Sequence, residues 1–365
     1  MARQQSTECT FLFDRLSMDF TYTADEASFL ISVRGHIPNM VPVDQCARSL
    51  VDSLALMSNV CSIEAIPPIS LMNLSAQTRI ESFASNSSTM DLRPWFDLGL
   101  TGKNQVVAVS DTGIYEESCY FQELSSENSK IIDYSSQTTD TTEDDVKGHG
   151  THVVGSIVGR KVIGDTDYPE DAANGIAVDA RVSFFDIGKN DQCCYIPYGI
   201  NYDSIEDLLN PGKMQGAKVH SASWGSPGND YNFYVKYLDR YIYSDESFLF
   251  ISAAGNTGFD GRNFDRNSSV IWPGTAKNAI SVGASNNVKS SPTSRMDTGY
   301  VSYFSARGPT EDNRIKPDIV APGLDVYSAR PFVSCGSQLK TGTSIATPCK
   351  YSLLVTGYHE KFDTN

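Results

Sequence analysis

The sequence predicts an α/β protein with a central, mostly parallel β-sheet covered by helices on both faces, preceded by a small α/β segment. From about residue 91, short apolar runs alternate with segments whose apolar residues repeat at helical spacing. The 365 residues include 40% hydrophobic and 20% charged residues, so the chain can bury the cores of one large and one smaller domain.

The smaller domain is predicted over residues 1–90. It contains a strand, an amphipathic helix and a second strand, and it ends in a stretch rich in Ser and Asn that is typical of a linker. We therefore place a domain boundary near residue 90, with a second domain over residues 91–365. The predicted elements lie at residues 27–33, 43–56, 61–66 and 82–90.

Strands of the second domain are predicted from near-continuous apolar runs, which are typical of strands buried on both faces of a parallel sheet. Two helices are predicted between them, at residues 204–209 and 231–243, and the second presents Val235, Leu238 and Ile242 on one face. Ligands of such folds bind at the carboxyl ends of the strands. The runs lie at residues 106–110, 182–187, 217–223, 248–254 and 279–284.

The charge balance disfavours nucleic acid and anionic membranes as partners. The chain has 29 basic and 44 acidic residues, a net charge of −15, whereas those partners attract clusters of Lys and Arg. No apolar run is long enough for a membrane span, and the N-terminus lacks the pattern of a secretory signal, so the compartment stays open. The sequence has no Walker-type or dinucleotide-binding glycine motif.

Eight cysteines show neither CxxC pairs nor the spacing of zinc ligands, so we expect no zinc site. Disulfides and buried thiols both remain open. Acidic stretches at residues 143–145 and 165–171 could bind calcium, although a solvated acidic loop is the simpler interpretation because no spaced set of oxygen ligands is present.

Four polar residues lie next to the ends of predicted strands and helices, where the predicted fold would place an active site. Asp111 ends the first buried strand, His149 opens a helix, Asn256 follows a strand, and Ser344 precedes a predicted helix. A serine hydroxyl becomes a nucleophile when an imidazole takes its proton. A buried carboxylate can orient that imidazole, and an amide can stabilise the oxyanion that forms.

Each of these residues also has a purely structural interpretation. Asp111 could cap a turn, His149 could be a core histidine, Asn256 could occupy a left-handed turn, and Ser344 could be a helix N-cap. The catalytic interpretation depends on all four occurring together, in this order.

The flanking residues resemble three signatures of the subtilisin-like serine proteases (subtilases, peptidase family S8). These are Asp-Thr-Gly at 111–113, His-Gly-Thr-His-Val-Val-Gly at 149–155 and Gly-Thr-Ser-Ile-Ala-Thr-Pro at 342–348. Residues 221–225, 304–309 and 316–323 also match, so the resemblance covers about residues 91–348. It implies a three-layer subtilisin-like fold and a serine endopeptidase that acts through an acyl-enzyme.

The resemblance also implies a role for each residue. Asp111 orients His149, His149 acts as base and then acid, Ser344 attacks the scissile carbonyl, and Asn256 holds the oxyanion. His152 is implied to be structural. The substrate would lie as an added strand along residues 223–225. Residues 253–255 would form one wall of the pocket that receives the substrate residue before the cleaved bond, and their small side chains leave room for a large apolar side chain. The implied substrate-binding residues are Ser223, Trp224 and Gly225, and Ala253, Ala254 and Gly255.

By the same resemblance, residues 1–90 form a pro-domain that blocks the cleft as an intramolecular inhibitor, and residues 60–73 form its end. An unrelated accessory domain is the alternative. The implied partners are polypeptide substrates, the implied state is a monomer, and no cofactor is required for the chemistry, with structural calcium as an option.

The sequence departs from the family after Ser344. Lys350 and Tyr351 stand where small or aliphatic residues are usual, and the sequence stops at Asn365, so we expect a domain truncated after the nucleophile helix. This motivates an alternative function, a truncated and inactive protease-like module that binds or inhibits. An esterase that uses the same serine is a third candidate.

Overall fold

The computed structural model divides the chain into two compact units, Met1–Ile66 and Pro67–Asn365. In the first unit, β1 (Ser17–Tyr22) and β2 (Phe29–Arg34) pair antiparallel, and β2 confirms the strand predicted at residues 27–33. The helix, second strand and linker predicted at 43–56, 61–66 and 82–90 lie outside the described residues, and the boundary near residue 90 stays a prediction. The structure describes residues 17–22, 29–34, 69–71, 96, 98–123, 129–136, 147–169, 171, 173–188, 195–196, 205–259, 267–286 and 300–349.

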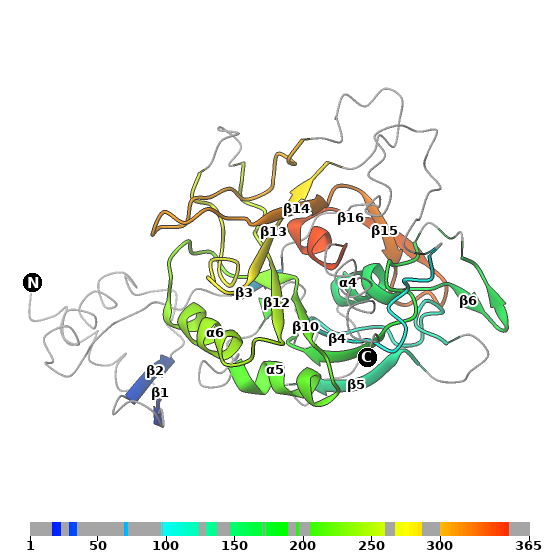
Figure 1. Cartoon of the computed structure of the whole chain (residues 1–365), viewed down its shortest axis with the longest axis horizontal. Helices are drawn as coiled ribbons and strands as arrows, with labels where there is room; N and C mark the ends of the chain where they lie inside the picture. The colour runs from blue at the N-terminus through cyan, green and yellow to red at the C-terminus, as the bar shows by residue number, and fades with distance from the viewer. Residues whose placement is uncertain are drawn as a thin grey trace, which may run out of the picture. The chain divides into compact units, whose positions relative to one another are not determined.

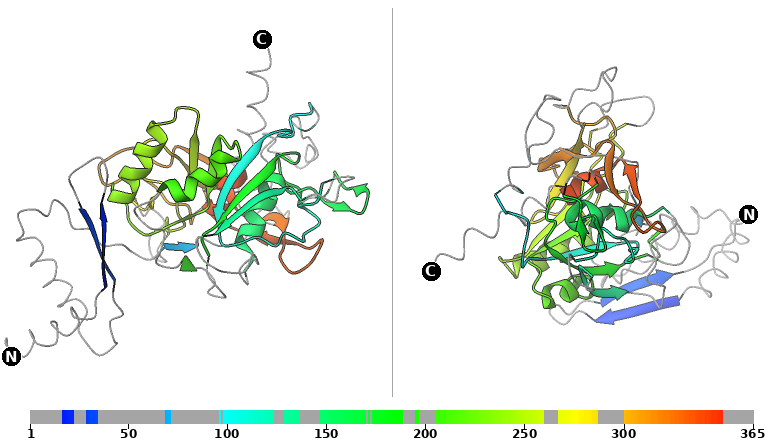
Figure 2. Two further views of the ribbon diagram at one scale, coloured as in Figure 1. Left: turned by 90° about the horizontal axis from the view of Figure 1, so that it is seen from below. Right: turned by 90° about the vertical axis from the view of Figure 1, so that its right-hand side faces the viewer.

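The second unit is built on a sheet of seven described strands in the order β14-β13-β12-β10-β4-β8-β5. Every neighbouring pair in this sheet is parallel. All five predicted strands are among them, and Figure 2 shows β4, β8 and β5 side by side. The strands are β4 (Val106–Asp111), β5 (Ile131–Ser136), β8 (Arg181–Asp186), β10 (Val219–Ala222), β12 (Leu249–Ala253), β13 (Ile280–Ser285) and β14 (Ile319–Pro322).

The two larger hydrophobic clusters of the described residues lie on the two faces of the sheet. One joins α4 (His149–Val158) and a helix described over residues 343–349 to the strands, through side chains such as Ile157 and Ile345. The other joins α5 (Ile205–Met214) and α6 (Phe233–Tyr243), through side chains such as Leu209 and Leu238. In Figure 1, α5 and α6 accordingly lie apart from α4. The result is the predicted three-layer architecture.

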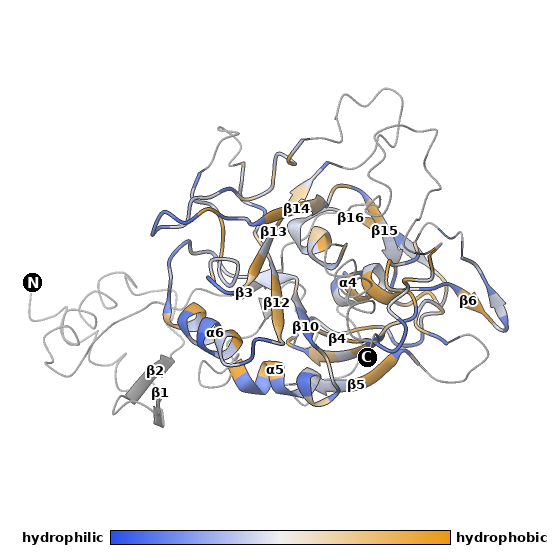
Figure 3. Cartoon of the chain, viewed as in Figure 1, coloured by the Kyte–Doolittle hydropathy of each residue, from blue (hydrophilic) through white to orange (hydrophobic). Residues whose placement is uncertain are grey.

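The helices follow the pattern of their apolar residues. Val235, Leu238 and Ile242 of α6 are buried as predicted, and Figure 3 shows apolar and polar residues segregating along α5 and α6. The Asn232 side chain caps α6 by accepting a hydrogen bond from the Val235 N–H.

The predicted end of α5 was wrong. The sequence placed it at residue 209, whereas the helix continues through Pro211 to Met214. Packing against the sheet explains the extension. Gly212 lies so close to β4 that a Cβ on it would be 2.4 Å from Cβ of Ala108, and this contact holds the last turn in place.

Small antiparallel sheets surround the central one. One strand, β11 (Trp224–Gly225), belongs to a three-stranded sheet in which β3 (Ile69–Leu71) lies between β11 and β9 (Tyr195–Ile196). The remaining strands form two hairpins: β6 (Val162–Ile163) with β7 (Thr166–Asp167), and β15 (Val326–Ala329) with β16 (Ser337–Lys340).

The described cysteines show both arrangements that the sequence left open. Cys119 and Cys335 form a disulfide that joins residues 216 positions apart. Cys349 is a buried free thiol whose pKa is raised to about 12 by burial. Within the described part of the chain, no helix has the length and apolar character required to cross a membrane.

Candidate active site

Asp111 and His149 lie in direct contact. Asp111 is the last residue of β4 and His149 the first of α4, and both side chains are fully buried. Nδ1 of His149 is 2.6 Å from Oδ1 of Asp111, which also accepts a hydrogen bond from the Thr112 N–H at 2.9 Å. Gly150 permits this close approach, because a Cβ there would lie 2.0 Å from the Gly113 carbonyl oxygen. The ends of a strand and a helix therefore form a buried carboxylate–imidazole pair.

The second ring nitrogen of His149, Nε2, is buried and makes no hydrogen bond to any described residue, Ser344 included. An imidazole that donates Nδ1–H to a carboxylate carries its lone pair on Nε2 and can take up a proton there. His152 differs, since its Nε2 lies 3.1 Å from the main-chain oxygen of Val326. Burial also holds the pKa of His152 well below its usual range, so this ring stays neutral in a structural position.

Ser344 is buried in the first turn of the helix described over residues 343–349. Its main-chain carbonyl accepts a hydrogen bond from the Ser223 hydroxyl at 2.6 Å. The Thr347 hydroxyl donates to the Thr343 carbonyl at 2.7 Å and so supports the same turn. A residue predicted to bind substrate is thus joined to the turn that carries the predicted nucleophile.

Asn256 is bonded to the residue before Ser344. Its Oδ1 accepts hydrogen bonds from the N–H of Thr343 at 2.9 Å and from the Thr343 hydroxyl at 3.0 Å. The Gly255 N–H donates to that hydroxyl at 3.0 Å. The Nδ2 group of Asn256 is buried and has no hydrogen-bond partner among the described residues. The amide is therefore held by its oxygen, with both N–H donors available.

The two segments predicted to contact substrate lie next to this turn. Trp224 and Gly225, which follow Ser223, form β11, where they pair antiparallel with Leu71 and Ser70 of β3. Residues 253–255, the second segment, run from the end of β12 to Asn256. A strand from the N-terminal part of the chain thus lies along the predicted substrate-binding edge.

A buried polar chain next to Asp111 was not predicted. The indole N–H of Trp224 donates to the Ser110 hydroxyl at 2.9 Å, and that hydroxyl lies 2.8 Å from Nε2 of His220. Burial lowers the pKa of His220 to about 3, so the ring is neutral. The only signal in the sequence was polar residues inside apolar strand runs, and their pairing depends on the parallel alignment of Ser110 with Ala222.

The acidic loop considered for calcium is held by internal ion pairs. Arg160 pairs with Asp167 and with Asp179, and Lys161 pairs with Asp171 at 2.7 Å. Across the described ranges, no group of three or more His, Cys, Asp or Glu side chains is arranged to hold a metal ion. Residues 143–145 lie outside those ranges, and structural calcium stays a prediction.

Several curated proteins are similar to this chain. The serine protease/ABC transporter B family protein tagD of Dictyostelium discoideum is 27% identical over 346 residues, covering 69% of this chain and 18% of that protein. The serine protease AprX of Bacillus subtilis (strain 168) is 31% identical over 274 residues, covering 68% of this chain and 55% of that protein. The chain therefore spans less than a fifth of the length of tagD and about half of AprX.

Several solved structures share the fold of this chain. Sphericase is 26% identical with a TM-score of 0.51, covering 72% of this chain and 79% of that one. The CspB protease of Clostridium perfringens shows the same fold at 16% identity, with a TM-score of 0.57 over 72% of this chain and 85% of that one. Residues 102–350, well over half of the chain, match the family described as the subtilase family, Peptidase_S8. The chain belongs to the subtilase family of peptidases.

Proposed function

We propose that this chain is a serine endopeptidase that hydrolyses peptide bonds through an acyl-enzyme on Ser344. The observation that carries the proposal is the buried pair of Asp111 and His149, 2.6 Å apart, with Nε2 of His149 left without a partner among the described residues. The family to which the chain belongs supports the same reaction class. Approach of the Ser344 hydroxyl to His149 Nε2 is part of the proposal.

The reaction would begin when His149 Nε2 takes the proton of the Ser344 hydroxyl, whose oxygen then attacks the scissile carbonyl carbon. Asp111 would hold the ring in one tautomer and stabilise its charged form. Collapse of the tetrahedral intermediate breaks the C–N bond, and His149 returns its proton to the leaving amine. Water, activated by the same ring, then releases the acyl group and restores Ser344.

Asn256 would stabilise the oxyanion together with the main-chain N–H of Ser344. The geometry supports this role because Thr343 binds the amide through its oxygen and leaves the Nδ2 donors unpaired within the described set. Donors that are already oriented need no reorganisation as charge develops, which makes them effective in the transition state.

The N-terminal part of the chain would act as an intramolecular inhibitor. β3 pairs antiparallel with β11 on one side and with β9 on the other, so it lies as the middle strand of that sheet. A polypeptide substrate would add to β11 in the same way, through main-chain hydrogen bonds that do not depend on its sequence. β3 and a substrate would then compete for one edge.

An active-site label tests the proposed function. A fluorophosphonate should label the full-length chain and fail to label a Ser344→Ala variant. Ser221→Ala is the matched control, because Ser221 is also fully buried and its hydroxyl makes no hydrogen bond to a described residue, and this variant should label like wild type. Equal labelling of Ser344→Ala would refute the assignment. A folded chain that takes no label, even when Ser70→Pro weakens the pairing of β3 with β11, would favour the inactive binding module.

A further inference from the structure

Ile271 lies between the two segments proposed to contact the substrate residue before the cleaved bond. From this position, and on the proposed function, we infer that Ile271 restricts that residue to a small side chain such as Gly, Ala or Ser. The flanking segments alone, with their small residues, led us to expect room for a large apolar side chain. Because Ile271 lies between these segments, we now expect a small substrate side chain instead of a large apolar one.

A single side chain touches both segments. A Cβ added to Gly225 would lie 2.6 Å from Cδ1 and 3.2 Å from Cγ1 of Ile271. A Cβ added to Gly255, in the opposite segment, would lie 3.1 Å from both Cγ1 and Cγ2 of Ile271. The glycine backbones are therefore in van der Waals contact with Ile271 from two sides, and its side chain spans the gap between them.

Main-chain hydrogen bonds hold Ile271 at that place. Its N–H donates to the carbonyl of Ala254 at 3.0 Å, within one segment. The next residue, Trp272, is bonded to the continuation of the other segment. Its carbonyl accepts from Ser226 at 3.0 Å, and its N–H donates to Gly228 at 3.1 Å. Residues 271–272 thus form the floor of the proposed substrate pocket, and main-chain hydrogen bonds join this floor to both flanking segments.

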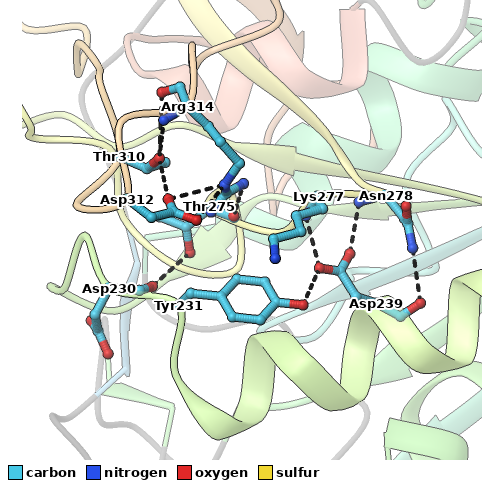
Figure 4. A network of polar contacts seen from close by, with 9 residues as sticks. All are labelled: Asp230, Tyr231, Asp239, Thr275, Lys277, Asn278, Thr310, Asp312 and Arg314. Carbon is cyan, nitrogen blue, oxygen red and sulfur yellow. Dashed lines mark hydrogen bonds and ion pairs between the residues drawn. The ribbon is translucent and has the colours of Figure 1, made fainter.

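Partly buried polar contacts, which Figure 4 shows, anchor the chain that follows Trp272. Asp239 of α6 accepts hydrogen bonds from the N–H groups of Lys277 at 2.9 Å and Asn278 at 2.7 Å, and from the Tyr231 hydroxyl at 2.7 Å. Arg314 donates to the Thr275 carbonyl at 2.7 Å.

Both ends of the segment are fixed and Ile271 is only 3% exposed, so its side chain is packed among neighbouring groups and a change of its position would disturb them. A phenylalanyl ring that entered between Gly225 and Gly255 would meet the Ile271 side chain, whereas a methyl group reaches less far into this gap. One misfitting methylene in such a pocket changes kcat/KM by about 10-fold to 200-fold, so a whole ring should be discriminated at least that strongly.

Two peptidyl phosphonates that differ only in alanine or phenylalanine at the reactive position provide the test, used with the full-length chain. We expect labelling of Ser344 to be at least about 10-fold faster with the alanine probe. Ile271→Ala should raise the phenylalanine-to-alanine rate ratio by at least about 10-fold, and Ile271→Val should lie between. Ile242→Ala is the matched control: this residue is equally apolar and 6% exposed in α6, and its loss should leave the ratio unchanged.

The wild-type ratio alone can overturn the inference, so the test does not depend on the folding of a variant. Equal labelling by both probes, or faster labelling by the phenylalanine probe, would refute the restriction while leaving the serine endopeptidase intact. A ratio unchanged in folded Ile271→Ala would also refute it. Failure of both probes to label folded protein, in wild type and in a Ser70→Pro chain whose β3 pairing is weakened, would overturn the proposed function together with the inference.

Discussion

The orientation of one amide shows how neighbouring residues prepare the site. Asn256 could present either its oxygen or its nitrogen to a bound carbonyl, and only the nitrogen can stabilise an oxyanion. Thr343 decides between them, since its N–H and hydroxyl both bond the amide oxygen, at 2.9 and 3.0 Å. Because Thr343 precedes Ser344, the residue that orients the donor also begins the turn of the nucleophile.

Asn256→Ala should therefore lower kcat without weakening substrate binding. We expect a loss of about 10²–10³-fold in kcat with little change in KM, because the lost donors act only on the charge of the transition state. Asn174→Ala, which removes a buried amide bonded to the Tyr168 carbonyl, is the control and should keep wild-type kcat. Steady-state hydrolysis of a peptide substrate measures both constants, and an unchanged kcat would remove Asn256 from the oxyanion site.

At the scale of elements, a buried lysine joins the end of α4 to the following loop. Lys130 Nζ donates to the carbonyls of Val158, the last residue of α4, at 2.8 Å and of Val178 at 2.7 Å. Burial lowers its pKa from 10.5 to about 7, with smaller and opposed effects from charged neighbours such as Asp179 and Arg160. The helix that begins with His149 is thus held at its far end by a buried lysine side chain.

This lysine should make stability depend on pH. Below about pH 7 it is charged in both the folded and unfolded states, so it contributes no pH dependence. Between about pH 7 and 10.5 the unfolded chain binds the proton more tightly, so the free energy of unfolding should rise with pH, by up to about 1.4 kcal/mol per pH unit.

Lys130→Met should abolish that rise, because methionine does not titrate. Urea unfolding of the two chains from pH 6 to 9, in a Ser344→Ala background to prevent self-cleavage, measures the difference. Lys103→Met, at an exposed lysine, is the control and should keep the wild-type slope. If the free energy of unfolding had the same pH dependence in wild type and in Lys130→Met, burial would not lower the pKa of Lys130.

At the scale of the whole molecule, segments far apart in sequence meet at the proposed substrate edge. Ser70 pairs with Gly225 on one side and with Tyr195 on the other, so β3 is bonded along both of its edges. Such a strand gains affinity from its backbone and would exclude a substrate until it is displaced.

Ser70→Pro should weaken this block, because proline lacks the N–H that pairs a central strand. Loss of one or two main-chain hydrogen bonds, at about 1 kcal/mol each, should increase the initial rate of peptide hydrolysis by freshly purified full-length chain about 10-fold. Ser75→Pro, four positions after Leu71 at the end of β3, is the control and should start at the wild-type rate. Equal initial rates for all three chains would contradict inhibition by β3.

The sequence by itself determined five of the seven described strands of the central sheet and the residue types at their ends, whereas β5 and β14 were not predicted. Apolar runs identified the strands because a parallel strand buried on both faces has few alternatives, and this pattern placed Asp111 at the end of β4. His149 at the start of α4 followed from local glycine and apolar spacing. Such features depend on neighbours within a few residues.

Only the tertiary structure decided how distant segments meet. The sequence could not place Ile271 between Gly225 and Gly255, which lie 46 and 16 positions before it. It could not place β3 beside β11, more than 150 positions away, or Cys119 against Cys335, 216 positions away. It also ended α5 too early, since packing of Gly212 on β4 outweighs the local effect of Pro211. Close packing between elements depends on the shape of every surface involved, and no local pattern carries that information.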